Sequence, residues 1–171
     1  MPPVAVLIGP PGAGKTSVGP LLAERLRTSF RDTDADISAT AGQPVSDIFI
    51  EQGEPAFRQL EREAAASALR EHDGVLALGS GAVLDPDLQL RLEGLPVVYM
   101  ATDFGTIARR LGLDRPRVVI PGNPRGRLRA MLEERRPLYE RLATVTIKTD
   151  DADPDELAEQ IAATLKEGPP R

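Results

Sequence analysis

The sequence predicts an α/β fold in which one parallel sheet is covered by helices on both faces. Short runs of strand character alternate with stretches of helical periodicity, and a glycine-rich phosphate-binding pattern joins the first run to the first helical stretch. This alternation is typical of parallel sheets, because each parallel strand needs a crossover to reach the next. With 171 residues, 41% of them hydrophobic, the chain can bury one sizeable core, so a single domain over residues 1–171 is expected.

The expected elements follow one another regularly along the chain. Short runs predict five strands, at residues 4–8, 30–32, 75–78, 97–100 and 145–148. Helical spacing predicts five helices, at residues 15–27, 55–70, 106–111, 125–142 and 154–166. Pro55 and Pro154 suit a first helical turn, because the N–H that proline lacks has no partner there.

The pattern G-x-x-x-x-G-K-[ST] occupies residues 9–16, directly after the first expected strand. Its glycines let the backbone turn successive N–H groups toward an anion, and the helix that follows begins with a partial positive charge. Lys15 would neutralise the β- and γ-phosphates, and the hydroxyl of Thr16 would bind Mg²⁺. We therefore expect the chain to bind a nucleoside triphosphate with Mg²⁺ through Gly12, Ala13, Gly14, Lys15, Thr16 and Ser17.

The overall composition excludes several classes of function. The formal net charge of −5 argues against nucleic-acid binding, and the lack of cysteine excludes disulfides and thiolate metal sites. The apolar runs are too short to span a bilayer, and the chain opens with a strand pattern rather than a leader pattern. We therefore expect a soluble, cytoplasmic protein with neither a nucleic acid nor a membrane as partner.

Two aspartates, Asp32 and Asp34, lie at the end of the second expected strand. In an extended chain their side chains point in different directions, so one can face a metal while the other faces a phosphate acceptor. Parallel folds bind ligands at the carboxyl ends of their strands, which is also the edge that carries the phosphate loop. The alternative is that either aspartate only caps the helix after it.

Two further segments carry arginines that could meet an anion. Arg58 and Glu61 are three residues apart on one expected helix and share a face, where the carboxylate can hold the guanidinium in one orientation. The alternative for this pair is an ordinary surface ion pair. Residues 113–127 mix arginines with prolines and glycines and have no sustained period, which indicates a mobile, cationic loop.

Together these motifs resemble the shikimate kinase family, a group of small P-loop enzymes similar to nucleoside monophosphate kinases. The resemblance covers nearly the whole chain in the family's order and spacing. A phosphate loop alone does not distinguish one kinase from another, but the full set does. The matching segments are residues 9–16, Asp32-Thr33-Asp34, Phe57-Arg58-Gln59-Leu60-Glu61, Gly79-Ser80-Gly81, an arginine-containing lid, and Arg135-Arg136-Pro137-Leu138-Tyr139.

The resemblance implies a three-layer sandwich with strand order 2-3-1-4-5 and a definite reaction. The γ-phosphoryl group of ATP would pass to the 3-hydroxyl of shikimate, in the route to chorismate and the aromatic amino acids. The resemblance assigns Asp32, with Thr16, to Mg²⁺ and Asp34 to the acceptor hydroxyl as base. It assigns Arg58 and Arg135 to the shikimate carboxylate, which a planar guanidinium can bind through paired hydrogen bonds.

The remaining roles also follow from the resemblance. Glu61 would hold Arg58 in place within an acceptor-binding segment at about residues 33–62. Gly79, Ser80 and Gly81 would lie between nucleotide and acceptor, although Ser80 replaces one of the family's usual three glycines. Arg110 and Pro154 would flank the adenine. In a lid at about residues 112–125, Arg117 would stabilise the transferring phosphoryl group, with Arg115 as the alternative.

Two rival functions differ in class. One is a related small-molecule kinase, such as a gluconate or nucleotide kinase, against which the Phe-Arg-x-x-Glu and Arg-x-Pro-Leu-Tyr segments argue. The other is a nucleotide-dependent binding module without catalysis, which only Ser80 supports. We expect an active kinase that acts as a monomer, with ATP and shikimate as its small-molecule partners.

Overall fold

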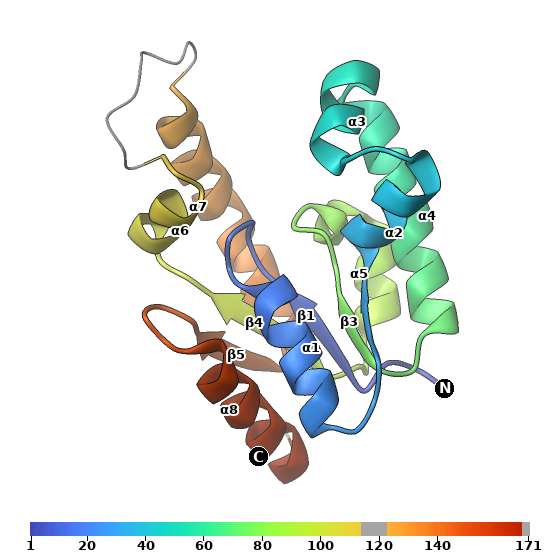
Figure 1. Ribbon diagram of the computed structural model, residues 1–171, viewed down its shortest axis with the longest axis vertical. Coiled ribbons are helices and arrows are strands. Elements are labelled where there is room, and N and C mark those ends of the chain that lie inside the picture. Colours follow the sequence, from blue (N-terminus) through green and yellow to red (C-terminus); the bar gives the residue numbers. More distant parts are fainter. Residues whose placement is uncertain (114–122, 169–171) are drawn as a thin grey trace.

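The computed structural model describes residues 1–113 and 123–168, which form helices packed around one sheet (Figure 1). Its five strands are all parallel and lie in the order β2-β3-β1-β4-β5. The strands are β1 (Ala5–Ile8), β2 (Phe30–Asp32), β3 (Val75–Ala77), β4 (Val97–Ala101) and β5 (Val145–Lys148). The expected fold class and strand order are therefore confirmed.

Eight α-helices and one 3₁₀ turn lie in the described part of the chain. They are α1 (Lys15–Arg25), α2 (Thr33–Ala41), α3 (Val45–Gln52), α4 (Glu54–Glu71), η1 (Ala82–Leu84), α5 (Pro86–Leu92), α6 (Phe104–Arg110), α7 (Pro124–Leu142) and α8 (Pro154–Glu167). The five expected helices match α1, α4, α6, α7 and α8 to within about two residues at each end. The helix α1 ends earlier than expected because Arg27 adopts a left-handed φ of 56°. The helices α2, α3 and α5 were missed by the sequence patterns.

Alternate residues of the central strands divide the core between the two faces of the sheet. Leu7 and Met100 pack with α1 and α8 on one face. Val6 and Tyr99 pack with α4, α5 and Tyr139 of α7 on the other face. Because β1, β3 and β4 are buried on both faces, their sequences are nearly continuous apolar runs, as expected for parallel strands.

Two helical groups rise above the carboxyl edge of the sheet. Figure 1 shows α2, α3 and the start of α4 on one side, and α6 with the start of α7 on the other. Small apolar clusters hold each group together, Ile37, Ile48 and Phe57 in the first and Ile107 with Leu128 in the second. The strands β1, β2 and β3 end at the edge between these groups, so the fold brings the motifs that follow them to one place.

Among residues 1–113 and 123–168, no helix combines the length and the apolar character that crossing a membrane requires.

Candidate active site

The phosphate loop leads directly from β1 into α1. Gly12 and Gly14 have φ values of 80° and 100°, a left-handed conformation that a side chain would strain. Gly14 is also the N-terminal cap of α1, and no side chain caps this helix. The first N–H groups of α1 are therefore left for an anion, as the motif predicts.

Lys15 folds back over this loop. Its Nζ donates hydrogen bonds to the carbonyl oxygens of Gly9 at 2.6 Å and Pro10 at 3.1 Å. Burial lowers the pKa of Lys15 to about 8, although the nearby carboxylates of Asp34 and Asp32 oppose that shift. Backbone carbonyls thus hold the ammonium group in the loop without neutralising it, so its charge can act on a phosphate.

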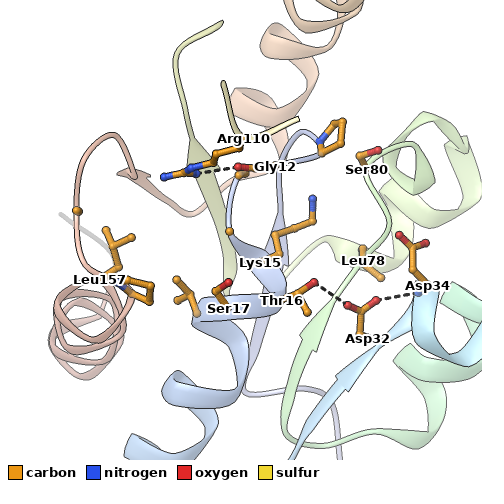
Figure 2. A pocket seen from close by; sticks show the side chains of 16 residues that line it. Gly12, Lys15, Thr16, Ser17, Asp32, Asp34, Leu78, Ser80, Arg110 and Leu157 are labelled. Atoms are coloured by element: carbon orange, nitrogen blue, oxygen red, sulfur yellow. Dashed lines mark hydrogen bonds between the residues drawn. The ribbon is translucent and has the colours of Figure 1, made fainter. Parts of the chain in front are cut away.

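Asp32 both caps a helix and contacts Thr16, the other residue expected to bind the metal. Its Oδ1 accepts a hydrogen bond of 2.8 Å from the N–H of Asp34 and so caps α2, while its Oδ2 accepts one of 3.2 Å from Thr16 Oγ1. Two protein oxygens therefore meet beside the phosphate loop, as Figure 2 shows. The described residues contain no group of three or more metal-binding side chains. A pair of oxygens fits Mg²⁺, which keeps several of its waters.

A cavity of about 510 Å³ extends along the phosphate loop. Figure 2 shows Asp34 and Ser80 at one end of it, Leu157 at the other and Lys15 between them. Gly12, Ala13, Gly14, Thr16 and Ser17 line it together with Arg110 and Pro154, so these predicted nucleotide residues share one cavity.

Arg110 is fixed at the nucleotide end of this cavity. Its guanidinium donates to the carbonyl oxygens of Gly12 at 2.7 Å and Thr149 at 3.2 Å. Ala152 and Leu157 form part of the wall beside Pro154. Sequence reasoning missed both, because Leu157 also belongs to the apolar stripe of α8 and reads as a core residue.

Asp34 lies between the phosphate cavity and the predicted acceptor residues. Its Oδ1 is buried and has no hydrogen-bond partner within residues 1–113 and 123–168. Burial and the neighbouring Asp32 raise the pKa of Asp34, while Lys15 and Arg58 oppose the rise. Because a buried polar atom normally has a partner, this oxygen is suited to accept a hydrogen bond from a ligand.

Arg58 and Glu61 form an ion pair that is not a surface pair. Arg58 Nη1 donates to Glu61 Oε1 at 2.8 Å, and the Glu61 side chain is only 4% exposed. Arg58 also lies 3.5 Å from a carboxylate oxygen of Glu54. Burial raises the pKa of Glu61 even though Arg58 opposes the shift. The surface alternative is therefore wrong, and Glu61 fixes Arg58 from within the fold.

The loop of Gly79, Ser80 and Gly81 passes close to these charged groups. A Cβ atom at Gly79 would lie 2.7 Å from Asp34 Oδ1 and 2.8 Å from Glu61 Oε2, and one at Gly81 would collide with the Arg58 guanidinium. Ser80 is not among the residues with positive φ, so a side chain fits at this position without backbone strain. Glycine at 79 and 81 therefore leaves room for the charged side chains of Asp34, Glu61 and Arg58, and serine is tolerated at 80.

The helix α7 contributes Arg135, which is only 8% exposed. Its charge lies close enough to Lys15 and Glu61 to shift the pKa of each. No carboxylate lies within 4 Å of Arg135 in the described part of the chain, whereas its neighbour Arg136 is exposed to solvent. A buried guanidinium without a carboxylate partner is suited to bind an anionic ligand.

Other predictions concern the segment before α7. Arg115, Arg117 and most of the expected lid lie outside the described residues. The nearest described position, Asn123, caps α7 by accepting a hydrogen bond of 3.1 Å from the N–H of Gly126.

Known proteins match this chain along nearly its whole length. The family profile described as shikimate kinase matches residues 11–166. A shikimate kinase of Thermobifida fusca is 55% identical to this chain over 163 residues, which cover 95% of each protein. A shikimate kinase of Salinispora arenicola is 51% identical over 165 residues, which cover 96% of this chain and 99% of the relative. The solved structure of the Acinetobacter baumannii shikimate kinase in complex with shikimate has a TM-score of 0.83 and 35% identity, covering 94% of this chain and 90% of that one. This chain therefore belongs to the shikimate kinase family.

Proposed function

We propose that the chain transfers the γ-phosphoryl group of ATP to the 3-hydroxyl of shikimate, giving shikimate 3-phosphate and ADP. This reaction belongs to the route to chorismate and the aromatic amino acids. The observation that carries the proposal is the position of Asp34, whose Oδ1 has no hydrogen-bond partner among the described residues. This oxygen lies between the cavity along the phosphate loop and the ion pair of Arg58 with the buried Glu61. An acceptor held there would have its hydroxyl next to the end of a bound triphosphate.

The nucleotide roles rest on the cavity along the phosphate loop. The N–H groups that begin α1 bind the phosphates, and Lys15 neutralises charge on the β- and γ-phosphoryl oxygens. Arg110 and Pro154 flank the adenine at the far end. Mg²⁺, held by Thr16 and Asp32, would neutralise phosphate charge there when bound. Thr16 and Asp32 keep their oxygens together on the side of the cavity that faces Asp34.

The acceptor roles rest on the charged groups at the other end of the cavity. Arg58 and Arg135 bind the carboxylate of shikimate, and Glu61 keeps Arg58 in orientation. The oxygen of the 3-hydroxyl forms a bond to the γ-phosphorus as the bond to the bridging oxygen of ADP breaks, and Asp34 takes the hydroxyl proton. The raised pKa of Asp34 favours this transfer, but positioning contributes more than basicity when the transition state is loose.

The remaining proposals concern two segments of the chain, its oligomeric state and its location in the cell. Residues at about 33–62 act as the acceptor-binding segment, and residues at about 112–125 act as a lid. From the lid, Arg117 would stabilise the transferring phosphoryl group, with Arg115 as the alternative. We also propose that the protein acts as a monomer in the cytoplasm, where ATP is plentiful; sedimentation and cell fractionation test these two points.

The test is ADP release by the purified chain with ATP and Mg²⁺, with and without shikimate. Phosphorus NMR of the product identifies the hydroxyl that is phosphorylated. Gluconate and nucleoside monophosphates, offered separately, test the related kinases. ADP release with one of them but not with shikimate would contradict the proposed substrate. ATP binding without release in any mixture would favour a binding module.

A further inference from the structure

Tyr139 lies in the core behind the acceptor side and takes no part in the proposed phosphoryl transfer. Its Oη donates a hydrogen bond of 2.7 Å to the carbonyl oxygen of Ser80. Its ring stacks on that of Tyr99, with centroids 5.1 Å apart and planes 22° apart. The residue is only 1% exposed, and burial raises the pKa of its phenol to about 12. Tyr139 is therefore a neutral donor whose neighbours fix its position.

The loop that accepts this hydrogen bond has few other fixed points. The N–H of Gly79 donates to Thr33 Oγ1 at 3.0 Å, and the N–H of Ala82 donates to the Gly79 carbonyl at 3.0 Å. Both bonds act on Gly79 rather than on Ser80. Among the described residues, Tyr139 is the one donor found for the Ser80 carbonyl, so its hydroxyl decides how this peptide is oriented.

This loop touches every charged group on one side of the acceptor site. Asp34 and Glu61 approach Gly79, and Arg58 approaches Gly81, so closely that a side chain at either glycine would fit only if these charged side chains moved. Arg135 lies on the other side, on α7, one helical turn before Tyr139. The hydrogen bond from Tyr139 to the Ser80 carbonyl therefore connects α7, which carries Arg135, with the loop beside Asp34, Glu61 and Arg58.

We propose that Tyr139 is a positioning residue for the acceptor. Its hydroxyl holds the Ser80 peptide and so fixes the position of the loop, and of the charged side chains beside it, relative to Arg135. The inference rests on the proposed function, because it assumes that shikimate binds between these groups. It predicts that the hydroxyl affects acceptor binding more than nucleotide binding, since Tyr139 itself does not line the nucleotide cavity and Ser80 lies at the acceptor end of it.

The experiment compares Tyr139→Phe with Tyr99→Phe. Tyr139→Phe removes one oxygen and keeps the stacked ring, so we expect the KM for shikimate to rise about three- to tenfold, while the KM for ATP and kcat stay within about twofold. Tyr99→Phe is the matched control, because it removes a hydroxyl from the other ring of the stack, and it should retain both KM values. A purely structural role would lower the amount of active enzyme and leave both KM values unchanged. That result, or an equal rise in the control, would overturn the proposal.

A second measurement does not depend on the folding of Tyr139→Phe. The chain has two tyrosines and no tryptophan, so Tyr139 is the single strong fluorophore of the Tyr99→Phe protein. Saturating shikimate should change its fluorescence, and an unchanged spectrum would contradict the proposal. Calorimetry of shikimate binding and product analysis of the wild-type chain test the proposed function separately. Shikimate that binds and reacts normally while Tyr139→Phe has no effect would reject only the positioning role.

Discussion

The nucleotide side of the site comes largely from one continuous stretch of the chain, residues 9–17. The acceptor side, in contrast, takes its charged groups from three helices, α2, α4 and α7, and its backbone from the loop after β3. On the nucleotide side, the backbone N–H groups that begin α1 are oriented for an anion, because a phosphate chain can be held by a turn and a helix end. On the acceptor side, buried side chains hold one another, as in the pair of Arg58 and Glu61. Phosphate binding is therefore a local property of the chain, whereas recognition of the acceptor depends on how the helices pack.

Asp34 belongs to both sides, so Asp34→Asn should have the largest effect. The amide cannot take up the hydroxyl proton, and we expect kcat to fall at least about 100-fold with little change in the KM for ATP. Steady-state kinetics with each substrate varied provide the measurement. Asp36→Asn is the control, because Asp36 pairs with Arg31 outside the cavity and its loss should leave kcat near the wild-type value. Unchanged turnover in Asp34→Asn would remove this residue from the mechanism.

Arg135→Ala should affect the acceptor side alone. Loss of a charge-assisted hydrogen bond costs about 1.5 to 3 kcal/mol, which corresponds to a roughly 10- to 150-fold rise in the Kd for shikimate. Calorimetric titration with shikimate, and separately with ATP, measures the two affinities. The neighbouring Arg136→Ala provides a matched control, because Arg136 is exposed on the same helix. An equal loss of affinity for both ligands would show that the two sides are not independent.

Rising pH should affect the nucleotide side first. The pKa of Lys15 is lowered to about 8 by burial, so its positive charge is lost as the pH rises through that value. Since kcat/KM reports the free enzyme, kcat/KM for ATP should fall with a midpoint near pH 8 and be about tenfold lower at pH 9 than at pH 7. The Kd for shikimate, measured without nucleotide, should change less over this range. A profile for ATP that stays flat to pH 9.5 would contradict the role of this charge.

Gly81→Ala should change the kinetics least, and it tests whether the close approach of Arg58 to the loop after β3 matters for acceptor binding. The new methyl group would displace the end of the Arg58 side chain, which is flexible enough to move without unfolding the protein. We expect the KM for shikimate to rise about three- to tenfold while the KM for ATP is unchanged. Gly105→Ala is the control, because the added Cβ would lie 3.4 Å from Asp103 Oδ1, an ordinary van der Waals distance. If Gly81→Ala behaves like this control, the close approach of loop and arginine has no role in binding.

The sequence predicted the parallel α/β fold and the long helices because their signals are local. A buried parallel strand is a short apolar run, and a long amphipathic helix repeats its apolar residues every three or four positions. The helix α2 lacks that signal, because Ile37 is its only large buried apolar residue. Its boundaries come instead from the Asp32 cap and from Gly42, whose φ is 71°. The helix α2 is thus a short element stabilised by its caps and by tertiary packing.

The sequence by itself determined the phosphate loop and the order of the elements, because neighbouring residues suffice to form a nest of N–H groups at a helix start. It also supplied the acceptor residues, through their match to family motifs. Only the tertiary structure decided that Glu61 is buried beside Arg58, that Asp34 Oδ1 has no partner in the described part of the chain and that Tyr139 meets Ser80. Burial and charge interactions depend on the packing of α2, α4 and α7 against the same sheet edge, and no local pattern specifies the distances between such remote segments.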